Sequence, residues 1–103
     1  MSSTQVSDNM EALIKLALEE DFGDGYVTST YFVPEGLQAR ALMRPRTQGV
    51  LSGVKVAEAV FRAVDPTLRV EVYLHDGEAV SPGAIVMMIE GSARSILGAE
   101  RTA

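Results

Sequence analysis

Two arginines near the carboxyl end of the chain have the clearest chemical potential. Arg94 and Arg101 lie in a segment with helical spacing, and because they are seven residues apart they fall on roughly one helix face. A planar guanidinium group binds a carboxylate or a phosphate through paired hydrogen bonds, so two such groups suit a small dianion. The alternative is that both arginines are surface residues that form ion pairs with Glu90 and Glu100.

An acidic run offers a second candidate site. Glu19, Glu20 and Asp21, followed by Asp24, supply carboxylate oxygens of the kind that Mg²⁺ and Ca²⁺ prefer. The run lacks the alternating acids and the distant glutamate of a calcium-binding loop. We therefore favour its interpretation as the solvated end of a helix followed by a turn.

A short basic run interrupts this acidic half of the chain. Arg40, Arg44 and Arg46 lie between Gln38 and Arg46 without an intervening acid, whereas Lys15 is the only basic residue among the first 35 residues, against seven acids. We interpret the run as a solvated strand face.

The remaining combinations of reactive residues are weaker. Four glycines could suggest a phosphate-binding loop, but they lack the spacing of a dinucleotide or nucleoside-triphosphate loop: Gly23, Gly25, Gly49 and Gly53. Ser81, His75 and Asp76 contain the residue types of a hydrolase triad, but nothing in the sequence places a nucleophile elbow there. We expect His75 to end a strand instead.

One segment suggests a carrier domain. The strand, turn and strand pattern of Val72 to Gly91 resembles half of a biotinyl or lipoyl carrier domain, which presents a lysine for modification at a hairpin tip. Lys15 and Lys55 both fall on predicted helices, so the sequence lacks the carrier chemistry.

Composition excludes several classes of protein. The chain has 103 residues, 47% hydrophobic and 22% charged, which is typical of one globular domain. It has no cysteine and one histidine, which excludes disulfides, cysteine zinc sites and histidine-rich metal sites. The net charge of −5 argues against general nucleic-acid binding. No apolar run is long enough for a membrane helix, and no signal-peptide pattern opens the chain, so we expect a cytoplasmic protein.

The first half of the chain predicts one helix and two extended segments. Met10, Leu13, Ile14 and Ala17 recur at helical spacing, which predicts a helix over Asn9–Glu20. We expect a glycine-rich turn at residues 21–25, a short extended piece at 31–33 and a strand over 37–43, which Pro45 bends or ends.

The second half predicts three strands and two helices. Glycines bound a short strand at residues 49–53, and Ser52 or Gly53 begins a helix to about Ala63. Alternation predicts a strand over 68–75, Asp76-Gly77 predicts a hairpin turn, and residues 84–89 form an apolar strand. A last helix, which Ser92 caps, runs to the final residue.

These elements indicate an α+β domain over residues 9–103, with helices packed on a mixed or antiparallel sheet, after a flexible tail at 1–8. No stop signal follows the last helix. We therefore expect the chain to end at a truncation or a proteolytic boundary, and its natural length stays open.

Several motifs occur in one order along the chain. They are Ala17–Gly25, Val27-Thr28-Ser29, Arg46, Gly49–Gly53, Asp76-Gly77-Glu78 with Val80, Pro82 and Gly83, Gly91, Ala93-Arg94 and Leu97 with Ala99–Ala103. In this order they resemble the amino-terminal domain of quinolinate phosphoribosyltransferases, the nicotinate-nucleotide pyrophosphorylases (carboxylating). The final Glu-Arg-Thr-Ala is the most specific piece. The chain departs from the family at Tyr26, where aspartate is usual, and at Pro45.

The resemblance implies a fold and a reaction. The fold is a hammerhead-like α/β arrangement. Quinolinate and phosphoribosyl pyrophosphate give nicotinate mononucleotide, pyrophosphate and carbon dioxide, in NAD biosynthesis. The metal is Mg²⁺, which a barrel domain outside this chain binds, and we expect no metal ligand or catalytic residue here.

The resemblance also implies how this domain takes part. It closes over the barrel of a second subunit in a homo-oligomer such as a dimer, and Arg101 reaches the quinolinate carboxylates in that partner's site. No role is assigned to Arg46 or Arg94, and we expect the chain to be inactive alone. The alternatives are a stand-alone carrier-like binding or scaffold module, and a domain of a related phosphoribosyltransferase-like protein associated with molybdenum transport.

Overall fold

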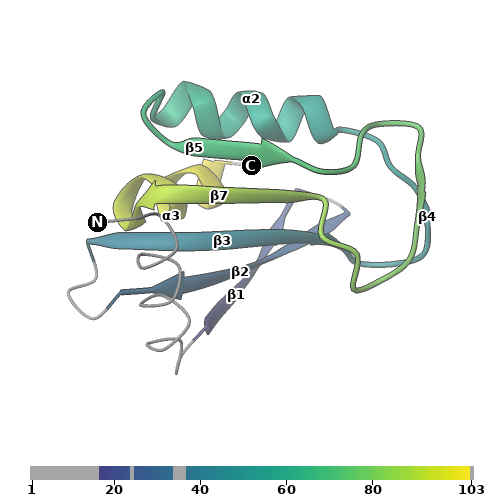
Figure 1. Cartoon of the computed structure of the whole chain (residues 1–103), viewed down its shortest axis with the longest axis horizontal. Helices are drawn as coiled ribbons and strands as arrows, with labels where there is room; N and C mark the ends of the chain where they lie inside the picture. The colour runs from purple at the N-terminus through teal and green to yellow at the C-terminus, as the bar shows by residue number, and fades with distance from the viewer. Residues whose placement is uncertain (1–16, 24, 34–36, 103) are drawn as a thin grey trace.

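An antiparallel β-sheet with helices on one face organises the chain (Figure 1). The computed structural model describes residues 17–23, 25–33 and 37–102. In chain order the elements are β1 (Ala17–Phe22), β2 (Tyr26–Phe32), β3 (Gln38–Pro45), β4 (Gly49–Val50), α2 (Val54–Val64), β5 (Arg69–Val72), β6 (Ala79–Val80), β7 (Met87–Ser92) and α3 (Ala93–Thr102). The predicted α+β class is confirmed.

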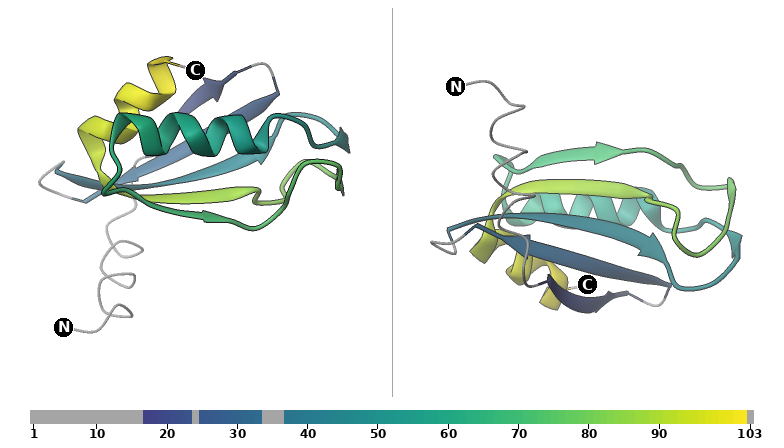
Figure 2. Two further views of the ribbon diagram at one scale, coloured as in Figure 1. Left: turned by 90° about the horizontal axis from the view of Figure 1, so that it is seen from above. Right: turned by 60° about the horizontal axis from the view of Figure 1, so that its bottom comes forward.

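Within the described residues the main sheet has five strands in the order β1-β2-β3-β7-β5, and each neighbouring pair is antiparallel. Both α2 and α3 cover the same face of this sheet (Figure 2). A second, two-stranded sheet of β4 and β6 extends from one end of the molecule.

Side chains alternate across the main sheet, as the period of a β-strand requires. In β3, Ala39, Ala41 and Met43 are buried under the helices, whereas Arg40 and Arg44 lie half-buried on the opposite face. The predicted strand over 37–43 is thus confirmed with an end shifted to Pro45. Pro45 ends the strand, because a proline cannot donate a further ladder hydrogen bond.

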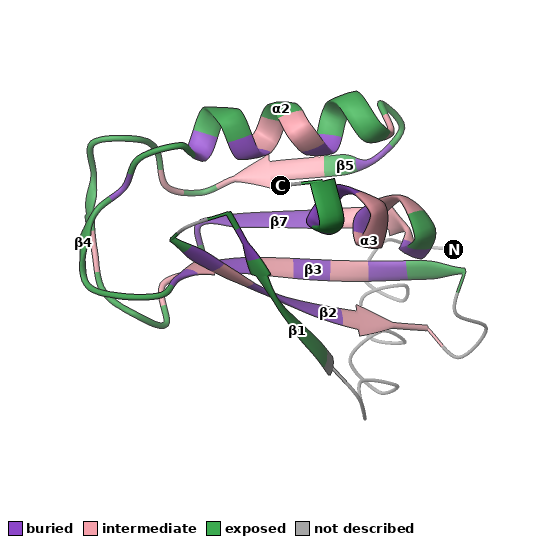
Figure 3. Ribbon diagram, turned by 180° about the vertical axis from the view of Figure 1, so that it is seen from behind, coloured by how far each residue is buried: buried purple, intermediate pink, exposed green. Residues whose placement is uncertain are grey.

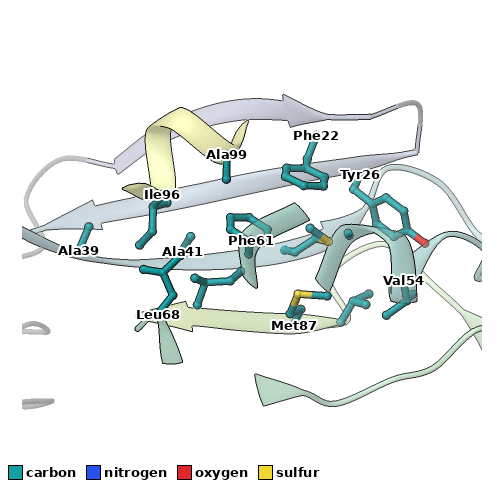
Figure 4. Packing of buried hydrophobic residues seen from close by; sticks show 14 of the residues in the cluster. Phe22, Tyr26, Ala39, Ala41, Val54, Phe61, Leu68, Met87, Ile96 and Ala99 are labelled. Carbon is teal, nitrogen blue, oxygen red and sulfur yellow. The ribbon is translucent and has the colours of Figure 1, made fainter. Parts of the chain in front are cut away.

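Aromatic and aliphatic side chains fill the space between the helices and the sheet (Figure 4). Phe61 of α2 is fully buried and stacks on Phe22 of β1, with ring centroids 5.0 Å apart and planes 10° from parallel. Ile96 and Ala99 of α3 enter the same core. This shared core fixes both helices relative to the sheet, because close-packed interiors allow little displacement.

Two side chains join α2 to loops that are distant in sequence. The hydroxyl of Tyr26, which is buried, donates a 2.6 Å hydrogen bond to the carbonyl oxygen of Ser52. Burial raises the pKa of the Tyr26 phenol above its ordinary value, so the group stays neutral and able to donate. Asp76 accepts a 2.8 Å hydrogen bond from the backbone N–H of Val54, and so caps the helix start.

The prediction for the amino-terminal helix is wrong where the structure tests it. Residues 17–20 were expected to end a helix, but they lie in β1, and the rest of the expected helix and the expected tail fall outside the described residues. All six residues of β1 pair with β2. Sheet pairing overrides the local helix preference of an Ala-Leu-Glu-Glu sequence.

One strand pairing and two strand boundaries in the second half of the chain also differ from the predictions. The turn at Asp76-Gly77 forms, and Gly77 has the positive φ of 92° that such turns favour, but the following strand β6 pairs with β4 instead of β5. The strand at 49–53 shortens to Gly49–Val50. The strand expected at 84–89 begins at Met87 and continues through Gly91, whose φ is 146° and where a Cβ would lie 2.7 Å from Leu68.

One carboxyl group lies inside this core. Glu100 of α3 is only 6% exposed, and its Oε2 accepts a 2.8 Å hydrogen bond from the hydroxyl of Thr30 in β2. Its Oε1 has no hydrogen-bond partner among the described residues. Burial raises the pKa of Glu100 above its ordinary value, and the charge of Glu20 adds to this, while the hydroxyls of Thr30 and Thr28 lower it.

We expect Tyr26→Phe to lower the free energy of unfolding by about 1 kcal/mol, because the variant leaves the carbonyl of Ser52 without its donor. Urea denaturation followed by circular dichroism measures the change. Tyr73→Phe is the control, since the hydroxyl of Tyr73 bonds to Glu71 on the exposed surface. Equal stabilities of wild type and Tyr26→Phe would contradict the expectation.

We expect Glu100→Gln to gain stability relative to the wild type as the pH rises. A carboxyl group with a raised pKa stabilises the folded state fully below its unfolded pKa, and this contribution is lost as the pH rises through the folded pKa. Glutamine keeps an acceptor for Thr30 but does not ionise. Urea denaturation between pH 5 and pH 8 measures the difference, and a constant difference over that range would show that Glu100 does not titrate in this way.

Candidate functional site

The helix α3 carries the arginine that the sequence singles out. The hydroxyl of Ser92 accepts a 3.3 Å hydrogen bond from the N–H of Ser95, so the predicted cap at Ser92 is confirmed. The helix then follows β7 without a linker and returns across the sheet (Figure 1). This direct connection sets the direction of α3 from the direction of β7.

The two faces of α3 differ in burial (Figure 3). Ala93, Ile96, Ala99 and Glu100 are buried. Arg94 and Arg101 are both exposed, as expected for residues seven positions apart on a helix whose opposite face is covered. The prediction that the two arginines share an outward face is therefore confirmed.

The expected surface ion pairs of these arginines do not form. Glu90 lies instead between Arg40 and Arg69, with 2.7 Å and 3.7 Å between its oxygens and their nitrogens. Glu100 points into the core. Among the described residues, no acidic side chain pairs with Arg101. Its charge is therefore available to a ligand or to another chain.

The position of Arg101 in α3 suits a cation whose hydrogen-bond donors are open to solvent. It lies in the last turn, where the helix dipole favours a cation. Next to it, the hydroxyl of Thr102 donates a 2.9 Å hydrogen bond to the carbonyl of Gly98 and satisfies one of the terminal carbonyls. The guanidinium presents its donors to solvent in the planar arrangement that a carboxylate matches.

The arginines of β3 have partners within this chain. The nitrogens of Arg40 bond to Glu90 on β7, and Arg44 donates a 2.9 Å hydrogen bond to Ser29 on β2. Arg46 forms an ion pair with Asp21. Acids thus compensate the charges of Arg40 and Arg46, while Arg44 bonds to a neutral hydroxyl. These contacts agree with the interpretation of the run as a strand face and do not support a separate anion site.

The acidic run does not converge on a metal position. As neighbours in β1, Glu19 and Glu20 point to opposite faces of the sheet, while Asp24 lies outside the described residues. Within residues 17–23, 25–33 and 37–102, no group of three or more histidine, cysteine, aspartate or glutamate side chains is placed to hold a metal ion.

The hydrolase triad is not assembled either. The carboxylate of Asp76 caps α2, and the ring of His75 lies 3.5 Å from Glu78 on the exposed surface. Ser81 has no hydrogen bond to His75. Lys55 lies in the first turn of α2 and not at a hairpin tip, as the helix prediction implied.

The run Gly49–Gly53 lines a cleft that the sequence did not reveal. The cleft has a volume of about 470 Å³ and lies between the β1–β2 turn, α2 and β6. Tyr26, Val56 and Val80 contribute to its mainly apolar wall. The described residues of that wall include no lysine or arginine, so the cleft alone does not suit a diacid. The glycines and valines at residues 49–56 are the only signal of this cleft in the sequence. Their pattern does not distinguish residues that line a cleft from residues that pack in a core.

Residues 17–23, 25–33 and 37–102 contain no helix with the length and apolar character needed to cross a membrane.

Comparisons with known proteins point to one family. The model of the quinolinate phosphoribosyl transferase N-terminal domain matches residues 24–103. The carboxylating, chloroplastic nicotinate-nucleotide pyrophosphorylase of Oryza sativa subsp. japonica is 38% identical over 94 residues, which are 90% of this chain and 25% of that protein. The probable carboxylating nicotinate-nucleotide pyrophosphorylase of Methanocaldococcus jannaschii is 30% identical over 91 residues, which are 88% of this chain and 31% of that protein.

A solved structure has the same fold. The crystal structure of NadC from Streptococcus pyogenes superposes with a TM-score of 0.60 at 24% identity, over 99% of this chain and 35% of that chain. The chain thus spans a quarter to a third of the length of these proteins. By the family model and the shared fold, the chain belongs to the quinolinate phosphoribosyltransferase family, as its amino-terminal domain.

Proposed function

We propose that this domain delivers Arg101 to the quinolinate carboxylates in the active site of a quinolinate phosphoribosyltransferase. One observation carries the proposal: within the family-matched segment, Arg101 is exposed on a well-packed helix and no described acid neutralises it. Quinolinate is a dianion, and a paired guanidinium contact offsets the charge that such a ligand brings into a site.

The reaction that we propose for the full-length enzyme uses two substrates. Quinolinate and phosphoribosyl pyrophosphate yield nicotinate mononucleotide, pyrophosphate and carbon dioxide. The ring nitrogen forms a bond to the ribose carbon, and pyrophosphate leaves with the electron pair of the bond that breaks. The carboxylate next to that nitrogen then departs as carbon dioxide, and the ring carbon that keeps its bonding electrons takes up a proton. Mg²⁺, held by a barrel domain outside this chain, would neutralise charge on the pyrophosphate. Arg101 binds and orients the diacid.

The site is completed, in this proposal, by a second subunit. The domain closes over the partner's barrel in a cytoplasmic homo-oligomer, and its exposed guanidinium points toward that surface. The apolar cleft at Gly49–Gly53, beside the exposed Val50 and Val56, gives the domain further surface that another domain or subunit would cover. The relatives' names favour this enzyme over a carrier-like module or a molybdenum-associated protein.

We expect Arg101→Ala in the full-length enzyme to lower kcat/KM for quinolinate by roughly 100-fold or more, because the diacid loses a charge-assisted contact. Steady-state formation of nicotinate mononucleotide measures the rate. Arg94→Ala is the matched control, since Arg94 is exposed on the same helix two turns away. Equal effects of the two substitutions, or an unchanged rate for Arg101→Ala, would remove Arg101 from the site.

We expect the 103-residue chain alone to form no nicotinate mononucleotide from quinolinate and phosphoribosyl pyrophosphate. It supplies a binding arginine, but among its described residues no group of three or more histidine, cysteine, aspartate or glutamate side chains is placed to hold a metal ion, and the wall of the cleft at Gly49–Gly53 carries no lysine or arginine for a pyrophosphate. Chromatographic detection of the product in the presence of Mg²⁺ measures this, with the full-length enzyme as the positive control. Turnover that depends on the chain's concentration would refute the division of roles between the two domains.

A further inference from the structure

The carboxyl group of Glu100 occupies an unusual position for a charged residue type. It immediately precedes Arg101, yet it is 6% exposed and lies under the last turn of α3. Acidic side chains are rarely buried without a cation, and no described cation contacts this one. A residue that costs stability to bury needs a reason other than packing.

The partner of Glu100 is held rigidly. Thr30 is fully buried in β2, a strand that pairs with β1 on one side and β3 on the other, where Leu18 and Ala41 face Thr30. The hydroxyl of Thr30 lies 2.8 Å from Oε2 of Glu100. The bond therefore joins the end of α3 to the interior of the sheet across 70 residues of sequence.

Helix ends need such a contact more than helix centres do. The last four carbonyl groups of a helix lack partners within it, and terminal turns fray readily. The apolar contacts of α3, from Ala93, Ile96 and Ala99, hold the helix against the sheet but do not fix its rotation by directional bonds. The bond of Glu100 is directional, and it acts one residue from Arg101.

We propose that Glu100 is a positioning residue, whose buried carboxyl group bonds to Thr30 to lock the last turn of α3 on β2 and so sets the direction in which Arg101 projects. This role rests on the proposed function of Arg101. The burial of Glu100 also suits an anionic ligand. It raises the pKa of the carboxyl group and so favours the protonated form, which adds no negative charge near a dianion. The nearby charged group is Glu20 of β1, which also favours the neutral form.

The first experiment measures the anchor in the 103-residue chain itself, without reference to activity. Amide hydrogen exchange is compared in the wild type, Glu100→Ala, Thr30→Val and Ser95→Ala. Ser95 is the matched control, because its hydroxyl bonds to Asp65 at 2.7 Å and ties the other end of the same helix to the α2–β5 loop. We expect the first two variants to speed exchange in residues 98–102 and the control to leave that turn unchanged.

The second experiment measures the consequence in the full-length enzyme. We expect Glu100→Ala and Thr30→Val each to raise KM for quinolinate roughly tenfold or more, because misplacing a binding group by a fraction of its reach weakens the contact strongly. KM for phosphoribosyl pyrophosphate stays constant. The double variant is no worse than the single ones, since both remove one bond. Glu100→Gln, which keeps an acceptor for Thr30, restores the quinolinate KM.

The outcomes separate the two proposals. If the variants only lose folded enzyme, the apparent kcat falls by the same factor whichever substrate is varied, and the KM values for quinolinate and for phosphoribosyl pyrophosphate stay unchanged. This result overturns the positioning role. Unchanged exchange in the last turn of Glu100→Ala overturns it as well, even if activity falls. An unchanged rate for Arg101→Ala overturns the proposed function instead, whatever Glu100 does to the exchange of its turn.

Discussion

The packing of α3 on the sheet is the constraint from which the rest of the site follows. The helix follows β7 directly, buries Ile96 and Ala99, and ends with a hydrogen bond from Thr30 to Glu100. A helix held along one face must present its opposite face to solvent. Arg101 is exposed because it lies on that opposite face, and its lack of a described acidic partner follows from the burial of Glu100, the acid next to it in sequence.

Charge is distributed unevenly over this scaffold. The arginines of β3 have partners on neighbouring strands, whereas Arg94 and Arg101 of α3 have no acidic partner among the described residues. The arginines of β3 lie in the sheet between strands that carry acids or hydroxyls, and Arg40 shares Glu90 with Arg69. Partly exposed pairs of this kind add only modest stability. At the end of α3 the chain does the opposite. It places a carboxyl group in the core and a guanidinium outside, so the two do not cancel each other.

The sequence predicted the elements that carry strong periodicity and failed where pairing partners decide. The helix at 54–64 and the strand of Ala39, Ala41 and Met43 follow from their spacing alone. Residues 17–20 were misassigned because a six-residue strand with Glu19 and Glu20 has no clear alternation, and only β2 beside it selects the extended form. The outward face of Arg101 could be predicted from a seven-residue interval. The burial of Glu100 could not be predicted, because a glutamate next to an arginine on a helix suggests a surface ion pair.

The buried glutamate also bears on how one small domain would supply a cation to a distant diacid in the proposed function. A guanidinium on a flexible loop would lose side-chain and backbone entropy each time it bound, and that cost would reduce the affinity of the contact. On α3 the backbone is already ordered by the core, and the carboxyl of Glu100 orders the terminal turn. The side chain of Arg101 is exposed beyond this ordered turn. Rigid support of the backbone below an exposed side chain would suit the proposed role, in which the guanidinium reaches across an interface to its ligand.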